Sequence, residues 1–379
     1  MAIWYNFQLN PIEHLNTVRV RGDMAKHIFS FCLLTLTALF LVWFWSVPTL
    51  AENSLKQPKL AEQNSSGLQR ILFINSYHRG YPWSDGIQQA LIDTLGLQPG
   101  REPETWEGHR VVLRVLYLNS KRNPGEEAIQ EVSGVAISTI REWQPDVVAT
   151  SDDNAVKYVV KPALKDFPLL PFVFSGVNWS ADEYDLPPDR VAGMIEVQPL
   201  DQIIQNLSPY AHGERIAFLK GYDSSAVKEA DAFEKFLDIK LNKVLVKNFT
   251  EWQKSYLQLQ QECDILLLGN FVSINDWDDK KARQLIKEET RIPTGTWDAW
   301  LREYVLLTFS TVPHEQGAWM AGAIRGILSG HSPAEFGTVL NHKATVYRNM
   351  AIAKQLKIVF PMEFIRRSWA VEQALENDP

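Results

Sequence analysis

Ser76, His78 and Asp85 are the residue types of a hydrolytic triad, and they fall within ten positions of one another. A working triad needs one hydrogen bond from nucleophile to base and a second from base to acid. Three groups on one short loop and the start of the next helix are poorly placed to form that sequence of bonds. We therefore expect no hydrolysis here, and Ser76 is instead a candidate for hydrogen bonding to a ligand.

The same loop carries three aromatic side chains, Tyr77, Tyr81 and Trp83. It follows the apolar run 71–74 and precedes a helical pattern over 87–95, which is typical of the carboxyl end of a buried strand. In an open α/β sheet, ligands bind beyond the carboxyl ends of the strands. The rings are therefore predicted to stack on a ligand, and the alternative is that they cover the loop's own core.

Acidic residues follow the strand-like run 146–150, where Asp152, Asp153 and Asn154 open a helical pattern. Asp and Asn are preferred N-caps, because their side chains accept hydrogen bonds from the free N–H groups of the first turn. One of these residues is enough for a cap. The second acid is then free to receive a cationic group of a ligand, such as an amine.

The run 172–174 is followed by Ser175, Gly176, Val177 and Asn178. Glycine permits close approach of a ligand to the backbone, and an asparagine side chain both donates and accepts hydrogen bonds. This segment is therefore a second candidate for polar recognition, and its alternative interpretation is a simple turn.

Lys121 and Arg122 follow the run 112–118 and could supply a cation for an anionic group. Glu126 and Glu127 come shortly after them, in what reads as the first turn of a helix. Acidic side chains favour the amino end of a helix, so a solvated helix start with ion pairs is the favoured interpretation.

The alternation of strand and polar loop restarts at the runs 215–219 and 264–268. The predicted ligand contacts of this second set are Tyr222, Asp223, Asn270, Trp297 and Asp298. Strands separated by about 10–15 residues of helical pattern indicate βαβ units and parallel sheets. Two such sets predict an α/β fold in which two Rossmann-like lobes are joined by a hinge.

A small-residue segment, with Gly317, Gly322, Gly326 and Gly330, resembles a membrane packing motif. The nearby charges of Glu315 and Arg325 argue against a membrane span. We expect this segment to be a helix that packs tightly on a sheet.

The amino end differs from the rest of the chain. Residues 28–47 are almost entirely apolar, Lys26 precedes them, and Thr49-Leu50-Ala51 has the small-residue character of a cleavage site. We predict that residues 24–51 are a secretory signal cleaved after Ala51, with either Met1 or Met24 as the first residue. The alternative is an uncleaved anchor through residues 28–47, because about 20 apolar residues can span a bilayer. Either segment would place the remainder in the periplasm or otherwise outside the cytoplasm.

Composition is that of a globular protein, with 379 residues, 45% apolar residues and 22% charged residues. Residues 52–67 are polar and are predicted to be a flexible linker. The formal net charge is −7, and it becomes −8 when residues 1–51 are removed. An acidic body gives no reason to expect nucleic acid as a partner. Cys263 is the single cysteine after residue 51, so no internal disulfide is expected.

The sequence carries none of the common enzyme motifs considered next. The chain has no phosphate-binding G-x-x-x-x-G-K-[ST] loop, no G-x-G-x-x-G, no H-E-x-x-H, no G-x-S-x-G and no paired C-x-x-C. Its eight histidines are dispersed, which does not suit a multi-histidine metal site. We therefore expect a protein that is not an enzyme and that carries no cofactor or metal.

The order and spacing of these segments resemble a known family, the substrate-binding proteins of uncharacterised ABC transport systems. That family has the architecture of type I periplasmic binding proteins, and its relatives also form extracytoplasmic sensor domains of histidine kinases. The matching segments are 75–85, 119–122, 151–155, 171–178, 193–196, 316–330 and 353–361. The resemblance covers roughly residues 70–365, and it departs from the family's Gly-rich turn at Leu301-Arg302-Glu303-Tyr304.

This architecture implies an amino-terminal lobe over residues 68–193 and a carboxyl-terminal lobe over 194–310. Residues 311–379 would then form a return crossing that completes both lobes, followed by the tail. The hinge crossings are expected near 191–196, around 292–296 and in the segment after Gly330.

The resemblance implies an extracytoplasmic solute-binding protein that captures a small molecule between its lobes for an ABC-type permease. An amine-bearing or aromatic solute suits the acidic and aromatic candidates best. The alternative is a ligand-sensing module that reports to a separate membrane kinase or cyclase. A retained anchor would favour sensing, and a cleaved signal would favour transport.

Overall fold

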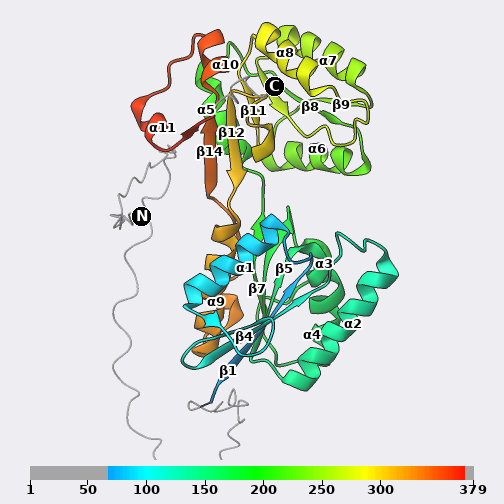
Figure 1. The fold of residues 1–379 in the computed structure, drawn as a ribbon, viewed down its shortest axis with the longest axis vertical. Helices are drawn as coiled ribbons and strands as arrows, with labels where there is room; N and C mark the ends of the chain where they lie inside the picture. The colour runs from blue at the N-terminus through cyan, green and yellow to red at the C-terminus, as the bar shows by residue number, and fades with distance from the viewer. Residues whose placement is uncertain (1–66, 372–379) are drawn as a thin grey trace, which may run out of the picture. The chain divides into compact units, whose positions relative to one another are not determined.

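The computed structural model describes residues 67–371, and these form two lobes that are each built on one sheet (Figure 1). The signal or anchor predicted within residues 1–51, and residues 52–66 of the linker predicted over 52–67, lie outside the described residues. None of the helices between residues 67 and 371 combines the length and the apolar character that a bilayer crossing requires.

Sheet A forms the amino lobe. Its strands within the described chain are β1 (Gln69–Asn75), β2 (Gln98–Pro99), β3 (Thr105–Glu107), β4 (Val111–Tyr117), β5 (Val147–Ser151), β6 (Phe172–Asn178), β7 (Val191–Glu196) and β13 (Thr338–Leu340). Their order is β13-β7-β6-β5-β1-β4-β3-β2, and all neighbours are parallel except β4 with β3 and β3 with β2. The run 71–74 is fully buried, as expected of a central strand that helices cover on both faces.

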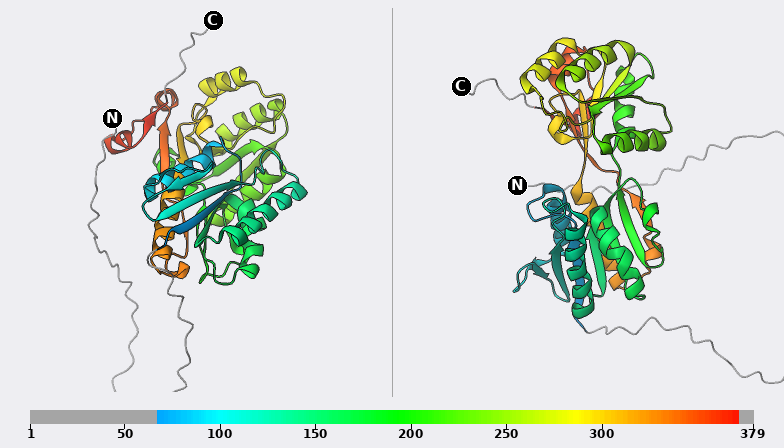
Figure 2. Two further views of the ribbon diagram at one scale, coloured as in Figure 1. Left: turned by 60° about the horizontal axis from the view of Figure 1, so that its bottom comes forward. Right: turned by 90° about the vertical axis from the view of Figure 1, so that its right-hand side faces the viewer.

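Helices cover both faces of sheet A (Figure 2). One face carries α1 (Pro82–Leu95) and α9 (Pro313–Leu328), which pack against each other. The other face carries α2 (Glu126–Trp143), α3 (Asp152–Ala155), the π-helix η1 (Val156–Val160) and α4 (Lys161–Asp166). Two 3₁₀ turns, η2 (Asp182–Tyr184) and η5 (Pro333–Glu335), complete this lobe.

Sheet B forms the carboxyl lobe. Its strands within the described chain are β8 (Ile216–Gly221), β9 (Asn242–Val246), β10 (Ile265–Leu268), β11 (Thr294–Thr296), β12 (Leu307–Thr311), β14 (Ala344–Arg348) and β15 (Trp369–Ala370). Their order is β15-β14-β12-β11-β10-β8-β9, and β12 with β14 is the antiparallel pair. The helical elements are α5 (Leu200–Leu207), η3 (Ser208–Tyr210), α6 (Ser224–Leu237), α7 (Phe249–Glu262), α8 (Asp279–Glu289), η4 (Ala299–Leu301), α10 (Met350–Gln355) and α11 (Met362–Arg366).

Both sheets repeat one strand order. In sheet A the first strand β1 lies between β4 and β5, and in sheet B the strand β8 lies between β9 and β10. In such doubly wound sheets the chain reverses direction across the sheet beside the first strand, and this switch point is where ligands bind. The prediction of two Rossmann-like lobes is confirmed, and the switch points lie at β1/β5 and β8/β10.

The chain passes between elements of the two sheets at residues 197–199, at Val312 and at residues 341–343. The crossing predicted around 292–296 is wrong, because Thr294–Thr296 is strand β11 inside sheet B. Its threonines are fully buried, and Thr294 Oγ1 accepts a hydrogen bond from the N–H of Leu306 at 2.9 Å.

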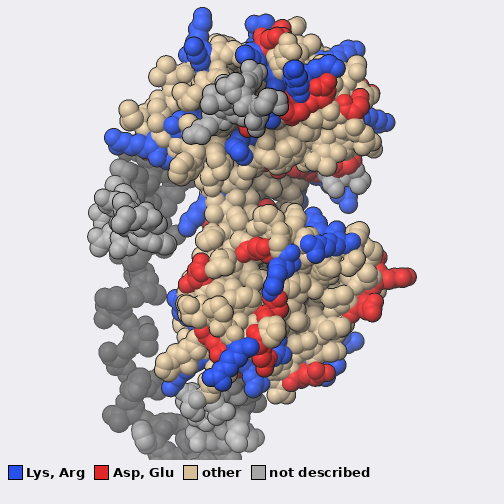
Figure 3. All heavy atoms as spheres, viewed as in Figure 1, with Lys and Arg blue, Asp and Glu red and all other residues tan. Residues whose placement is uncertain are grey.

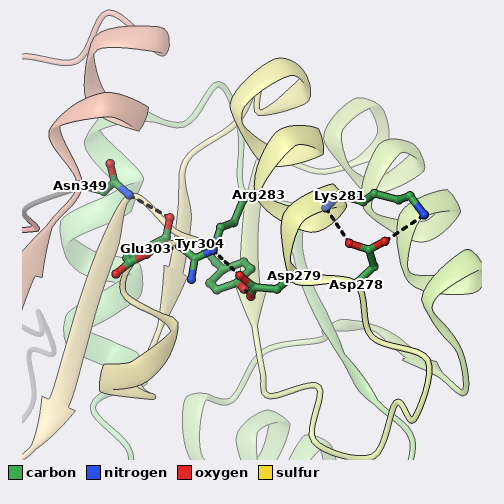
Figure 4. A network of polar contacts seen from close by, with 7 residues as sticks. All are labelled: Asp278, Asp279, Lys281, Arg283, Glu303, Tyr304 and Asn349. Atoms are coloured by element: carbon green, nitrogen blue, oxygen red, sulfur yellow. Dashed lines mark hydrogen bonds and ion pairs between the residues drawn. The ribbon is translucent and has the colours of Figure 1, made fainter. Parts of the chain in front are cut away.

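A polar network fixes the connection between β11 and β12 (Figure 4). Arg283 on α8 forms ion pairs with Asp279 on the same helix and with Glu303 on this connection. Asn349, the N-cap of α10, donates its side-chain N–H to the Glu303 carbonyl oxygen at 3.1 Å. These contacts hold Glu303 against α8 and the start of α10. They therefore fix the backbone of the connection that follows Asp298.

Candidate ligand-binding site

Asp152 lies at the switch point of the amino lobe, directly after β5. Its φ of 66° is in the left-handed region, which few residues other than glycine, asparagine and aspartate adopt. The residue is only 2% exposed, and its Oδ2 has no hydrogen-bond partner among the described residues. Buried polar atoms are normally paired, so an unpaired carboxylate oxygen here points to a partner from outside the chain.

The cap predicted for Asp152 or Asp153 is wrong, because neither side chain caps helix α3. Ser76 takes that place: its Oγ accepts from the N–H of Ala155 at 2.8 Å and donates to the Ser151 carbonyl at 2.6 Å. Ser76 is fully buried, and these bonds satisfy its hydroxyl group. Its role is to join the ends of β1 and β5, which differs from the predicted ligand contact and from any role in a triad.

Asp153 is committed within the lobe. Its Oδ1 accepts from the hydroxyl of Tyr184 at 2.9 Å, and its Oδ2 accepts from the side-chain amide of Asn178 at 2.7 Å. Asn154 is also committed, since its amide donates to Ser120 Oγ at 2.9 Å. Of the two neighbouring acids, Asp152 is therefore the one left free for a ligand.

Asp152, Asp153 and Glu196 form what we call the acidic cluster. Burial and the neighbouring Asp153 raise the pKa of Asp152 to about 8. Burial also raises the pKa of Glu196 well above its usual range, with Asp152 as the next contribution. Like charges brought together out of water disfavour ionisation. A cation placed beside the free oxygen of Asp152 would favour the charged form of that carboxyl group.

Gly176 brings the backbone of β6 close to this cluster. Its φ is 72°, and a Cβ there would lie 3.3 Å from Asp152 Oδ1 and 3.5 Å from Trp83 Nε1. The segment 175–178 belongs to strand β6, with a register shift at Gly176, so the turn interpretation is wrong. Gln316 at the start of α9 accepts the N–H of Gly176 at 3.1 Å through Oε1.

Two donors near Gly176, Gln316 Nε2 and Ser175 Oγ, lack a hydrogen-bond partner among the described residues, whereas the side chains of Ser151 and Trp83 interact with the Asp152 carboxyl group. They surround the same strand ends as the free oxygen of Asp152. The site therefore offers hydrogen-bond donors as well as acidic groups, as polar recognition of a small molecule requires.

The predicted aromatic platform has a local role as well. Tyr77 and Tyr81 pack edge to face with ring centroids 4.7 Å apart. The ammonium of Lys121 lies 4.7 Å from the centroid of Tyr77 and 5.6 Å from that of Tyr81. Burial, followed by the charge of Asp152, raises the pKa of Tyr77. The two rings therefore lie beside the acidic cluster, and we call them the tyrosine wall. They hold the ammonium of Lys121, which the sequence analysis had placed at a solvated helix start.

The switch point of the carboxyl lobe has a different chemistry. Lys220 at the end of β8 is buried and forms an ion pair with Glu229 on α6. Burial, with Glu229 next, raises the pKa of Asp298 to about 6, and Asp298 Oδ2 has no partner among the described residues. Asn270 follows β10 and interacts with the Asp298 side chain. This lobe thus presents the free Oδ2 of Asp298 near the ion pair of Lys220 with Glu229.

Three predicted contacts of this lobe lie elsewhere. Trp297 is buried in the core, where its ring meets Phe233 at 4.9 Å. Asp223 caps α6 by accepting from the N–H of Ala226. Tyr222 is about half exposed and lines a surface cavity of about 400 Å³ between α6 and β9. Core packing therefore holds the Trp297 ring, and helix capping engages one oxygen of Asp223.

The site residues that the sequence analysis missed are Glu196, Gln316, Lys220 and Glu229. Glu196 is the last residue of β7 and Lys220 the last but one of β8, so a search for polar residues at the carboxyl ends of buried strands could have found both. Gln316 and Glu229 lie on helices, and only the packing of α9 and α6 brings them to the strand ends.

No protein-family model and no curated protein sequence matches the chain. Among solved structures, the ligand-free, open structure of a substrate-binding protein with adhesive properties from Clostridium difficile superposes with a TM-score of 0.60 at 14% identity. The match covers 80% of this chain and 99% of that one.

Two further solved structures are less similar. An ABC domain in complex with L-Trp from Streptococcus pneumonia has a TM-score of 0.49 at 16% identity, over 80% of this chain and 100% of that one. A sugar ABC transporter from Actinomyces odontolyticus has a TM-score of 0.49 at 15% identity, over 76% of this chain and 97% of that one. At these identities the likeness concerns the fold: the chain has the two-lobed α/β fold of type I periplasmic binding proteins.

Proposed function

We propose that the chain is an extracytoplasmic solute-binding protein, which captures a small molecule between its two lobes and delivers it to an ABC-type permease. The observation that carries the proposal is Asp152, a buried carboxylate with a free oxygen at the switch point of the amino lobe. Keeping such a group out of water is unfavourable unless a partner compensates it. The fold shared with a substrate-binding protein supports the same conclusion.

The chemistry of the cluster favours a cationic solute. The free Asp152 oxygen can receive an ammonium group, and the tyrosine wall, which already holds the Lys121 ammonium, can face an aromatic ring. The free Asp298 oxygen of the carboxyl lobe can accept a second hydrogen bond from the same molecule. We infer an amine-bearing solute, with an aromatic part as a compatible addition.

Native mass spectrometry of the protein purified from its host identifies a co-purified molecule, and calorimetry with that molecule then tests the site. Asp152→Asn keeps the shape and the left-handed backbone but removes the charge. Losing a charge-assisted hydrogen bond costs about 1.5–3 kcal/mol, so affinity should fall about 10- to 100-fold. Unchanged affinity would remove Asp152 from the site.

Asp185→Asn is the matched control. Asp185 also has a left-handed backbone, with φ 51°, and lies exposed in the same lobe. Its replacement should leave the affinity unchanged, since it is not part of the acidic cluster. Equal losses in both variants would indicate a general effect of the substitution rather than a contact with the solute.

Capture of a solute is common to transport and to sensing. Cross-linking of the loaded protein in host membranes, followed by identification of the linked chain, separates the two. A permease would support delivery, whereas a membrane kinase or cyclase would replace it with the sensory role.

A further inference from the structure

Apolar side chains protrude from the last described part of the carboxyl lobe. Val359 is 86% exposed, Met362 is 65% exposed and Trp369 is 68% exposed. They come from the connection between α10 and α11, the start of α11 and strand β15. Exposed fractions this high belong to side chains that project from the surface, whereas the floor of a groove is half buried.

The backbone that carries them is firmly held. Phe360 and Phe364 are buried between these protruding residues, and their rings stack with centroids 5.2 Å apart. The Phe360 ring also packs against Tyr210, with centroids 5.8 Å apart. The Arg348 guanidinium donates to the carbonyl oxygens of Ile365 and Ser368. The protruding side chains are therefore displayed by an ordered segment with its own core contacts.

The charge of this segment is opposite to that of the whole protein. Between residues 350 and 371 the basic residues are Lys354, Lys357, Arg366 and Arg367, all exposed, and the one acidic residue is Glu363. The chain as a whole carries −7. In the face drawn in Figure 3, the edge of the carboxyl lobe near α11 shows Lys and Arg among uncharged side chains, while the rest of the lobe mixes both signs.

We propose that Lys354, Lys357, Val359, Met362, Arg366 and Trp369, the basic apolar surface, dock the carboxyl lobe onto an anionic lipid bilayer. Apolar side chains flanked by Lys and Arg are typical of surfaces that lie in the lipid headgroup region. Each basic residue near an anionic leaflet contributes to binding, and tryptophan favours the membrane interface. A bilayer also accommodates projecting side chains without a preformed complementary pocket.

An acidic protein surface is the competing occupant. It would pair with the basic residues, but it would have to provide a separate apolar recess for each projecting side chain. The basic apolar surface includes none of the strand-end residues of the ligand site, so the two proposals fail independently.

Vesicle co-sedimentation tests the proposal, with phosphatidylcholine alone and with a mixture of phosphatidylcholine and phosphatidylglycerol. The chain from Asn64 onward is suitable, because it forms one compact unit that contains every described core cluster and lacks the apolar run. We expect sedimentation with the anionic vesicles only, and weakening as salt screens the charges.

Two double variants separate the charged and apolar contributions. Lys354→Glu with Arg366→Glu should weaken binding to anionic vesicles about tenfold or more. Val359→Asn with Met362→Gln should weaken it without abolishing the salt dependence. Lys254→Glu with Lys280→Glu makes the same charge change on α7 and α8, and it should bind as the unaltered protein does.

Circular dichroism and thermal melting establish that each variant is folded. Equal sedimentation with neutral vesicles, or equal losses in the two charge-reversal variants, would overturn the proposal. Binding of the unaltered protein to an acidic protein surface in place of vesicles would overturn it as well.

Discussion

A single side chain, Asp152, connects recognition to stability. Its carboxyl group has a pKa of about 8 in the folded protein against an ordinary value of 3.8. The folded state therefore holds this proton more tightly than the unfolded state does. Below the ordinary pKa both states are protonated and the group costs nothing. As pH rises toward 8 its contribution becomes increasingly unfavourable, and above 8 the cost is constant.

Asp152→Asn should therefore stabilise the protein without ligand, and more so at high pH. One pKa unit corresponds to about 1.4 kcal/mol, so a gain of a few kcal/mol is expected at about pH 9 and little at about pH 4. Thermal melting across this range measures the difference. Asp185→Asn provides the control with a similar backbone, and a pH-independent difference for Asp152→Asn would contradict the buried charge.

The acids of the site were only partly predictable from sequence. Asp152 was found because it follows a buried apolar run, which is a local signal. The expectation that one of the acids caps the helix is wrong, because the Ser76 hydroxyl accepts the N–H of Ala155 instead. That bond joins residues far apart in sequence, so no local pattern could reveal it.

At the level of elements, two glycines of helix α9 differ in how closely neighbouring atoms approach them. A Cβ at Gly317 would lie 2.1 Å from the carbonyl oxygen of Ile87 and 2.8 Å from the Cβ of Ala90, both on α1. A Cβ at Gly322 would meet nothing within 4 Å. The small-residue helix thus packs closely on α1 as well as on sheet A, where the sequence predicted the sheet alone.

Gly317→Ala should lower the free energy of unfolding by about 1–3 kcal/mol, the usual cost of overpacking. Gly322→Ala should be neutral or raise it by up to about 1 kcal/mol, because alanine is the better helix former. Urea unfolding of both variants measures the contrast. Similar values for the two would show that α1 and α9 do not approach as closely as described.

The elements that were predicted well are those with long apolar runs. The runs 71–74, 112–118 and 146–150 became β1, β4 and β5, which helices cover on both faces. The crossing expected around 292–296 came from the family architecture, and it falls on strand β11, Thr294–Thr296. Those threonines are buried by neighbouring strands, which local composition alone does not reveal.

For the whole molecule, three chain crossings join the two lobes, at 197–199, at Val312 and at 341–343. So few connections allow hinge bending, in which a ligand favours the closed state only through its extra affinity for that state. The amino lobe offers the acidic cluster, and the carboxyl lobe offers the free oxygen of Asp298. A solute that binds both should therefore draw the lobes together.

Small-angle X-ray scattering of the protein, with and without its co-purified solute, tests this account most directly. The radius of gyration should decrease at saturating solute in the unaltered protein and in Asp185→Asn. At the same solute concentration, Asp152→Asn should remain at the larger radius. An unchanged radius for the unaltered protein with solute demonstrably bound would contradict capture by closure of the two lobes.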